Sequence, residues 1–355
     1  MEDGNAACYD SFDTVAERKQ KDVKAVNITF LILATVPELL GLTGLLSFIS
    51  SYGARLLISQ ILFVLPVVVY LICFKKSAAI CRFKKIKISN LLLCFLFYIC
   101  VFPVMMFLST VSLLYSKNAI SGMVLGITDE LPLAAGLLIV AIIPAFCEEM
   151  TYRGVFYNTY REVNPLGAIF MSGILFGLLH ANLNQISYAI ALGIVFALLV
   201  EATDSIFASM IVHGLINSFS TVLIYLIPKA VNYLQQLIEE AEAAGDTMTL
   251  EMLRNLTGTD NLTVESFMGN GQNLSTVEVL YSIAGALIPA SVGGALAFFL
   301  FRLIAKRCGR WEHVKGIFTN NHKQGKLITA PLIIAILFLV VVTFLNELVI
   351  RGIIG

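Results

Sequence analysis

The feature that most constrains this chain is a series of long apolar segments, each close to the length that crosses a lipid bilayer. A membrane-spanning helix needs about 20 consecutive, mainly apolar residues. Segments of this kind lie at about 27–50, 55–74, 90–115, 132–163, 165–182, 185–202, 205–228, 279–304 and 327–354. Only 14% of the 355 residues are charged, whereas a soluble domain carries about 25%. We therefore predict an all-α fold, a polytopic membrane helix bundle with about nine transmembrane helices.

Basic residues gather in two of the connections between these segments. Residues 75–87 carry six basic side chains and no acid, and residues 306–326 are also strongly basic. Connections rich in Lys and Arg remain on the cytoplasmic side of a membrane. We therefore expect both connections and the N-terminus in the cytoplasm, with the protein in the plasma membrane. The acidic residues 229–277 then fall outside.

These expectations divide the chain into five parts. We predict a cytoplasmic N-terminal tail (1–26), N-terminal membrane helices (27–129), a core that carries the candidate chemistry (130–228), an acidic extramembrane loop (229–278) and C-terminal membrane helices (279–355).

The first candidate site is a double glutamate inside an apolar segment, where ionisable residues are costly and functional by default. Residues four apart share one face of a helix, so Glu149 is expected to pair with Arg153. Glu148 points about 100° away from Glu149, which leaves it free to face a polar cavity as a general base. The alternative is an ion-paired anchor at the membrane surface.

Two histidines lie in later apolar segments. His180 follows Phe176 by four residues, and His213 precedes Asn217 by four. His213 and Asn217 share a helix face and could both donate to one oxygen, as an oxyanion hole requires. The alternative is an ordinary interhelical hydrogen bond.

Taken together, these residues resemble a known signature. The pattern Glu148-Glu149-x-x-x-Arg153, Phe176-x-x-x-His180 and His213-x-x-x-Asn217 is similar to the three motifs of the CPBP family. That family contains CAAX prenyl endopeptidases, bacteriocin-processing and self-immunity proteins and abortive-infection proteins. The resemblance covers about residues 130–228, which we therefore expect to be a CPBP-like catalytic core.

The resemblance implies an intramembrane peptidase and a role for each matching residue. Glu148 would activate water with help from His180, and His213 with Asn217 would stabilise the tetrahedral oxyanion. Glu149 and Arg153 would be supporting residues. One feature fits poorly, because the apolar run of the fifth helix puts His180 near its outer end while Glu148 lies at middle depth. We expect that helix to begin deeper in the membrane or to tilt.

A metal is a second possibility at the same site. Glu148, His180 and His213 could bind zinc, but the HExxH helix of a typical zinc peptidase is absent. A mechanism with glutamate-activated water and no cofactor is therefore preferred, with zinc as the alternative.

Polar residues outside this cluster have simpler interpretations. Glu347 with Arg351 is interpreted as an ion pair at a membrane boundary, and Glu201 is interpreted similarly. His313 lies in a basic connection and is expected at a solvated surface.

The predicted function is hydrolysis of a peptide bond in a membrane-associated peptide or protein, either a prenylated CAAX-type tail or a leader peptide. The alternatives are a non-catalytic immunity or scaffold protein and a proton-coupled transporter that uses the same Glu and His residues. The expected partners are the substrate and the bilayer. The 24 basic residues balance the 24 acidic ones, which excludes the basic field of a nucleic-acid binder. The sequence does not predict an oligomeric state.

Overall fold

The described part of the chain is built from helices. The computed structural model describes residues 3–44, 48–117, 127–128, 130–257, 262, 274–319 and 324–353, and these contain helices and no strand. Eight of the helices are long and apolar enough to cross a membrane, and α8 (Pro165–Leu178) is a shorter apolar helix. The predicted all-α polytopic bundle is confirmed.

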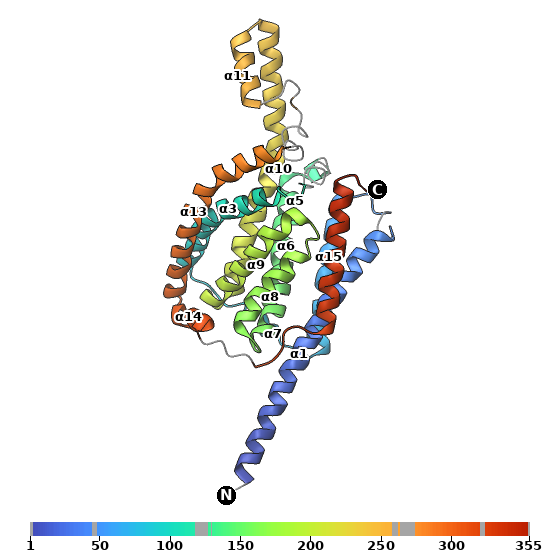
Figure 1. Cartoon of the computed structure of the whole chain (residues 1–355), viewed down its shortest axis with the longest axis vertical. Helices are drawn as coiled ribbons and strands as arrows, with labels where there is room; N and C mark the ends of the chain where they lie inside the picture. Colours follow the sequence, from blue (N-terminus) through green and yellow to red (C-terminus); the bar gives the residue numbers. More distant parts are fainter. Residues whose placement is uncertain are drawn as a thin grey trace.

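The N-terminal helix is longer than the sequence suggested. Helix α1 (Asp3–Leu42) continues without a break through most of the expected tail (1–26), and its first half projects from the bundle (Figure 1). Its apolar part lies beside α2 (Tyr52–Cys73) and α15 (Ala330–Ile350). Asn27 is fully buried and donates to the carbonyl of Leu327, which ties α1 to the segment before α15.

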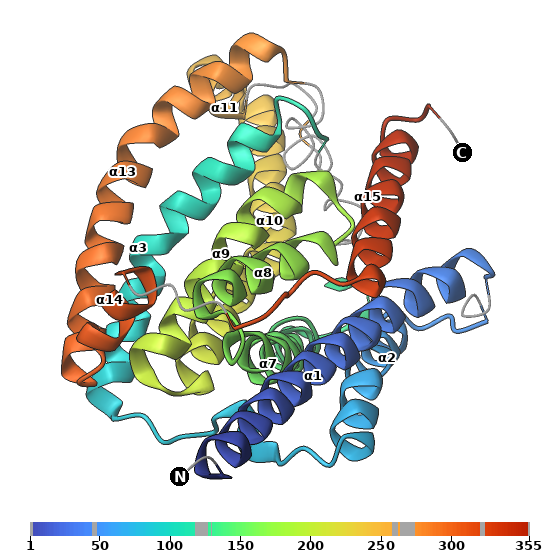
Figure 2. The ribbon, with the colours of Figure 1, turned by 60° about the horizontal axis from the view of Figure 1, so that its bottom comes forward.

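Two helices form one side of the bundle. Helix α3 (Ile88–Ser112) runs beside α13 (Thr276–Arg307), and the two make the most extensive contact in the structure (Figure 2). A short helix that was not predicted, α14 (Trp311–Thr319), follows α13 and packs against α9.

The fourth apolar segment is a helix with two π-helical stretches. It runs through α5 (Leu133–Gly136), the π-helical η2 (Leu137–Ile142), α6 (Ile143–Glu149), the π-helical η3 (Met150–Tyr157) and α7 (Asn158–Arg161). A π-helical stretch widens the turn and often marks a functional site. The double glutamate lies in the last turn of α6, directly before the second stretch.

Helices α8 and α9 (Leu183–Thr203) pack unusually closely. A Cβ atom on Gly173 would lie 2.7 Å from the carbonyl oxygen of Ile190, and one on Gly193 would lie 2.6 Å from the Cα of Gly173. Small residues allow membrane helices to approach in this way. The close approach brings side chains from both helices around Arg153.

The long helix α10 (Ile206–Ala244) extends well beyond the bundle. It forms a hairpin with α11 (Thr247–Thr257), which projects on the side opposite the N-terminus (Figure 1). The expected extramembrane loop (229–278) therefore begins inside a continuous helix.

Candidate active site

A fully buried ion pair lies at the centre of the site. Arg153 Nη1 donates to Glu149 Oε1 at 2.8 Å, and both side chains have an exposed fraction of 0%. The Arg153 guanidinium also lies 4.5 Å from the ring centroid of Phe176 and 5.0 Å from that of Phe196. Contact with aromatic faces stabilises a desolvated cation. The pairing predicted from helical spacing is present, although Arg153 itself lies in the π-helical stretch.

His213 of α10 bridges the two glutamates. Its Nδ1 lies 3.0 Å from Glu149 Oε1, and its Nε2 lies 3.8 Å from Glu148 Oε2. A carboxylate only accepts hydrogen bonds, so Nδ1 carries the proton and Nε2 faces Glu148. The ring also stacks on Phe196, with centroids 5.2 Å apart.

The two adjacent carboxyl groups lie in different surroundings. Glu149 is fully buried, whereas the side chain of Glu148 retains an exposed fraction of 19%. Glu148 therefore keeps access to solvent or substrate while Glu149 is committed to Arg153 and His213. This is the division that the sequence predicted for the pair.

His180 joins the cluster from the end of α8. Its Nδ1 lies 2.8 Å from the carbonyl oxygen of Phe176. Because a carbonyl only accepts, Nδ1 carries the proton and Nε2 presents a lone pair. The Phe176 ring packs against both imidazoles, with centroids 5.0 Å from His180 and 5.6 Å from His213.

The length of α8 explains the depth at which His180 lies. Its 14 residues span about 21 Å, less than the roughly 30 Å hydrocarbon core. The helix therefore ends inside the bundle, beside the side chains of α10. The expectation that this helix begins deeper in the membrane or tilts stays a prediction.

A tight turn fixes the position of His180. Ala181 adopts φ +47°, a left-handed conformation that is uncommon outside glycine. Asn346 of α15 donates to the Ala181 carbonyl at 3.0 Å, and the Asn182 side chain caps the start of α9. Strained residues held by their surroundings cluster at functional sites.

Asn217 lies one helical turn beyond His213 on α10 and is half-buried. Its backbone carbonyl accepts from Thr221 at 2.8 Å. Among the described residues, its carboxamide has no hydrogen-bond partner. The amide is therefore available to donate to a ligand.

The candidate zinc ligands do not form a cage. Within the described part of the chain, no three His, Cys, Asp or Glu side chains lie close enough to share an ion. The Phe176 ring packs against both imidazoles, where a zinc site would need Glu148, His180 and His213 to converge on one point. The free Nε2 atoms suit metal binding, but the donor set as placed does not fit zinc.

Sequence reasoning missed a second charged cluster, around Glu201 at the end of α9. This carboxylate is fully buried. Its partners come from three other segments: Arg82 at 3.5 Å, Tyr157 at 2.8 Å, Arg161 at 2.9 Å, Arg310 at 3.2 Å and His313 at 2.5 Å. Glu201 is therefore more than an ordinary ion pair. His313 is exposed, as expected for a solvated surface, but it also contacts Glu201.

The Glu347 pair is the ordinary contact that was expected. Arg351 Nε donates to Glu347 Oε1 at 2.7 Å, and the same carboxylate accepts from the backbone N–H of Lys117 at 3.0 Å. The pair ties the end of α15 to the segment after α3.

Comparison with known proteins matches the segment that holds this site. The family model described as "Type II CAAX prenyl endopeptidase Rce1-like" matches residues 130–219, which include all the candidate catalytic residues. Residues 130–219 are therefore similar to the CPBP family, in agreement with the resemblance of the three motifs.

One curated relative is a Bacillus subtilis (strain 168) protein named "Putative membrane peptidase YdiL". The two are 28% identical over 114 residues, which are 32% of this chain and 45% of the relative. The chain therefore spans less than half the length of the relative that it matches. No solved structure gives a significant match.

Proposed function

We propose that this protein is an intramembrane endopeptidase that hydrolyses a peptide bond in a membrane-associated peptide or protein. The observation that supports this best is the partly exposed carboxylate of Glu148 beside His213, whose other nitrogen is held by Glu149. The family description and the name of the relative support the same activity.

In the proposed reaction Glu148 is the general base. Its carboxylate takes a proton from water while the water oxygen attacks the scissile carbonyl carbon. The Nε2 lone pair of His180 accepts a hydrogen bond from the same water. When the carbon–nitrogen bond breaks, Glu148 returns the proton to the departing amine. Protons therefore balance without a cofactor.

His213 and Asn217 are proposed to hold the oxyanion. Since Nδ1–H of His213 is directed to Glu149, Nε2 can donate only when the imidazole is protonated. The Asn217 carboxamide supplies a second donor. Glu149 and Arg153 act as supporting residues, because they fix the orientation of His213.

The proposed substrate is a peptide that reaches the site through the membrane, either a prenylated CAAX-type tail or a leader peptide. The two basic connections favour a cytoplasmic N-terminus in the plasma membrane. The bilayer and the substrate are the partners that this proposal requires.

The function can be tested with purified protein in detergent and a library of peptides prepared from a proteome. We expect defined cleavage products with the wild type and a rate at least about 100-fold lower with Glu148→Gln. Gln has the size of Glu but cannot take the proton, so the variant should elute and melt like the wild type. Intact peptides with both proteins would favour the transporter or the scaffold, and equal cleavage by both would remove Glu148 from its role.

A further inference from the structure

An apolar groove with a basic mouth lies between α1 and α2, away from the candidate active site. Its volume is about 520 Å³. The apolar walls include Ile28 and Ile32 from α1 and Leu65 and Val69 from α2, all more than one third exposed. Lys21 and Lys24 line one end. Figure 2 shows α2 beside α1.

The residues of α1 divide between two faces. Lys21, Lys24, Ile28 and Ile32 follow helical spacing and share the groove face. Another face is bonded to the segment before α15, since Gln20 Nε2 donates to the Lys326 carbonyl at 2.8 Å. The groove face is therefore the side of α1 that the bundle leaves open.

The charges at the mouth of the groove are not neutralised. Asp22 is paired with Lys76 of the connection after α2 at 2.5 Å. Lys21 and Lys24 are exposed, and neither is paired with an acid among the described residues. Two lysines thus stand directly beyond an apolar groove, where they could meet a negative group.

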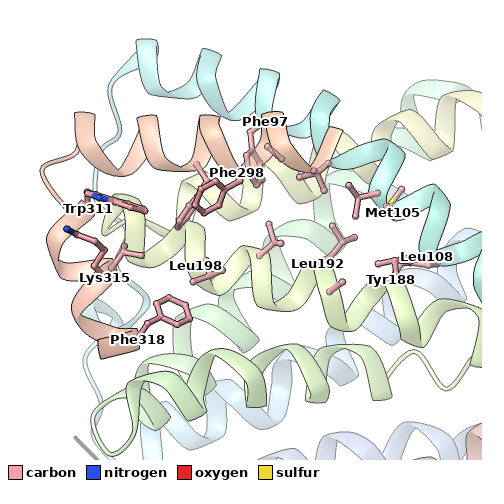
Figure 3. Close-up of a pocket in the computed structure, with 18 of the residues that line it drawn as sticks. Phe97, Met105, Leu108, Tyr188, Leu192, Leu198, Phe298, Trp311, Lys315 and Phe318 are labelled. Carbon is pink, nitrogen blue, oxygen red and sulfur yellow. The ribbon is translucent and has the colours of Figure 1, made fainter. Parts of the chain in front are cut away.

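A second groove gives a useful contrast. It lies between α3, α9, α13 and α14, has a volume of about 490 Å³ and includes Leu192, Phe298 and Trp311 (Figure 3). Its one basic lining residue, Lys315, is already paired with Glu312 at 2.6 Å. The two grooves are both apolar, but only the α1–α2 groove carries basic side chains without an ion-pair partner in the described part of the chain.

We propose that the α1–α2 groove binds one anionic phospholipid of the surrounding bilayer. An acyl chain would lie along the apolar walls, and the headgroup phosphate would lie between Lys21 and Lys24. Basic side chains directly outside a membrane helix attract anionic lipid headgroups. The apolar walls would bury the acyl chain, which is favourable because apolar surface leaves water. This inference is independent of the peptidase reaction.

The test compares lipids retained by the full-length protein. Protein is equilibrated with equal amounts of phosphatidylglycerol and phosphatidylcholine that carry the same acyl chains, and bound lipid is measured by native mass spectrometry. We expect the wild type to retain phosphatidylglycerol in preference. Each lysine near the surface contributes about fivefold, so Lys21→Gln with Lys24→Gln should lower that preference by roughly 30-fold.

Two further variants test the contribution of the lipid headgroup and that of the acyl chain separately. Lys315→Gln is the matched control in the second groove and should leave the preference unchanged. Ile28→Trp fills the α1–α2 groove and should reduce retention of the bound phosphatidylglycerol without any change of charge. Equal retention of both lipids by the wild type would overturn the proposal. So would a loss with Lys315→Gln as large as that of the double variant.

Discussion

Two buried carboxylates, Glu149 and Glu201, show how similar residues differ in what they are available to do. Both have an exposed fraction of 0%. Glu149 binds Arg153 and His213, and it lies beside Glu148, which remains partly exposed. Glu201 binds five side chains from three other segments.

The two carboxylates differ in whether the polar atoms around them already have a partner. At Glu201, arginines, a histidine and a tyrosine surround the carboxyl group, and the cluster joins α7 and α14 to the end of α9. A polar network satisfied in this way fixes one arrangement of the chain. Around Glu149, the Nε2 atoms of both histidines and the Asn217 amide have no hydrogen-bond partner among the described residues. We infer that the Glu201 cluster stabilises the fold and that the Glu149 cluster carries the proposed chemistry.

The largest effect is expected at Asn217. If its amide donates to the oxyanion, Asn217→Ala should lower kcat by about 100- to 1000-fold with little change in KM, because that bond strengthens only in the transition state. Steady-state kinetics on a peptide found in the library would measure this.

A second substitution at this position, Asn217→Asp, tests the effect of a negative charge beside the proposed oxyanion. A carboxylate repels an oxyanion, so this variant should be slower than Asn217→Ala. If the Asp variant stays active and carries one zinc per chain by mass spectrometry, the metal-free mechanism is wrong.

The second-largest effect is expected at Glu201, and it tests whether Glu201 and Glu149 have different roles. Glu201→Gln leaves three arginines without their shared counter-charge, and breaking a buried ion pair costs about 3–5 kcal/mol. We expect a lower yield and an earlier thermal transition in detergent, with unchanged kcat per folded molecule. Glu149→Gln should lower both the thermal transition temperature and kcat, because Glu149 also orients His213.

The matched control for this comparison is Glu312→Gln. Glu312 has an exposed fraction of 80% and pairs with Lys315, so the substitution should leave the thermal transition temperature unchanged. If Glu201→Gln slows the folded enzyme as much as Glu149→Gln does, the two clusters do not have separate roles.

The sequence predicts those features that depend on local spacing. The spans follow from the length of the apolar runs, and the Glu149–Arg153 pair follows from two residues four apart on one helix. Sequence analysis did not identify the Glu201 cluster, because its partners lie at positions 82, 157, 161, 310 and 313. Only tertiary packing brings such distant residues together.

The lengths of individual elements were also hard to predict. Helices α1 and α10 continue far beyond their apolar parts, because polar sequences with good helix formers extend a helix that packing has already nucleated. The end of α8 beside Phe196 depends on the contact of its glycines with α9, and no local pattern reports that contact.

The smallest effect concerns Asp204, which follows α9 and contacts the edge of the Glu201 cluster. Its Oδ1 lies 3.3 Å from Arg82 Nη1, and Oδ2 accepts a hydrogen bond from Lys84. Burial raises the pKa of Asp204, but the Lys84 hydrogen bond and the charges of Arg82 and Arg310 outweigh burial and hold the pKa below its usual value. The folded protein therefore binds this proton less readily than the unfolded chain.

The sign of the pH dependence follows from that lowered pKa. The stabilisation from Asp204 is complete above the unfolded pKa of about 3.9 and is lost as the pH falls through the lower folded value. The wild type should therefore melt slightly above Asp204→Asn from neutral pH down to about pH 5, and the two curves should converge below about pH 4. The difference is expected to be small, because the Asp204 and Lys84 side chains are partly exposed. Thermal unfolding in detergent followed by circular dichroism at several pH values would measure it, and a difference that widens in acid would show that these cations do not stabilise the carboxylate.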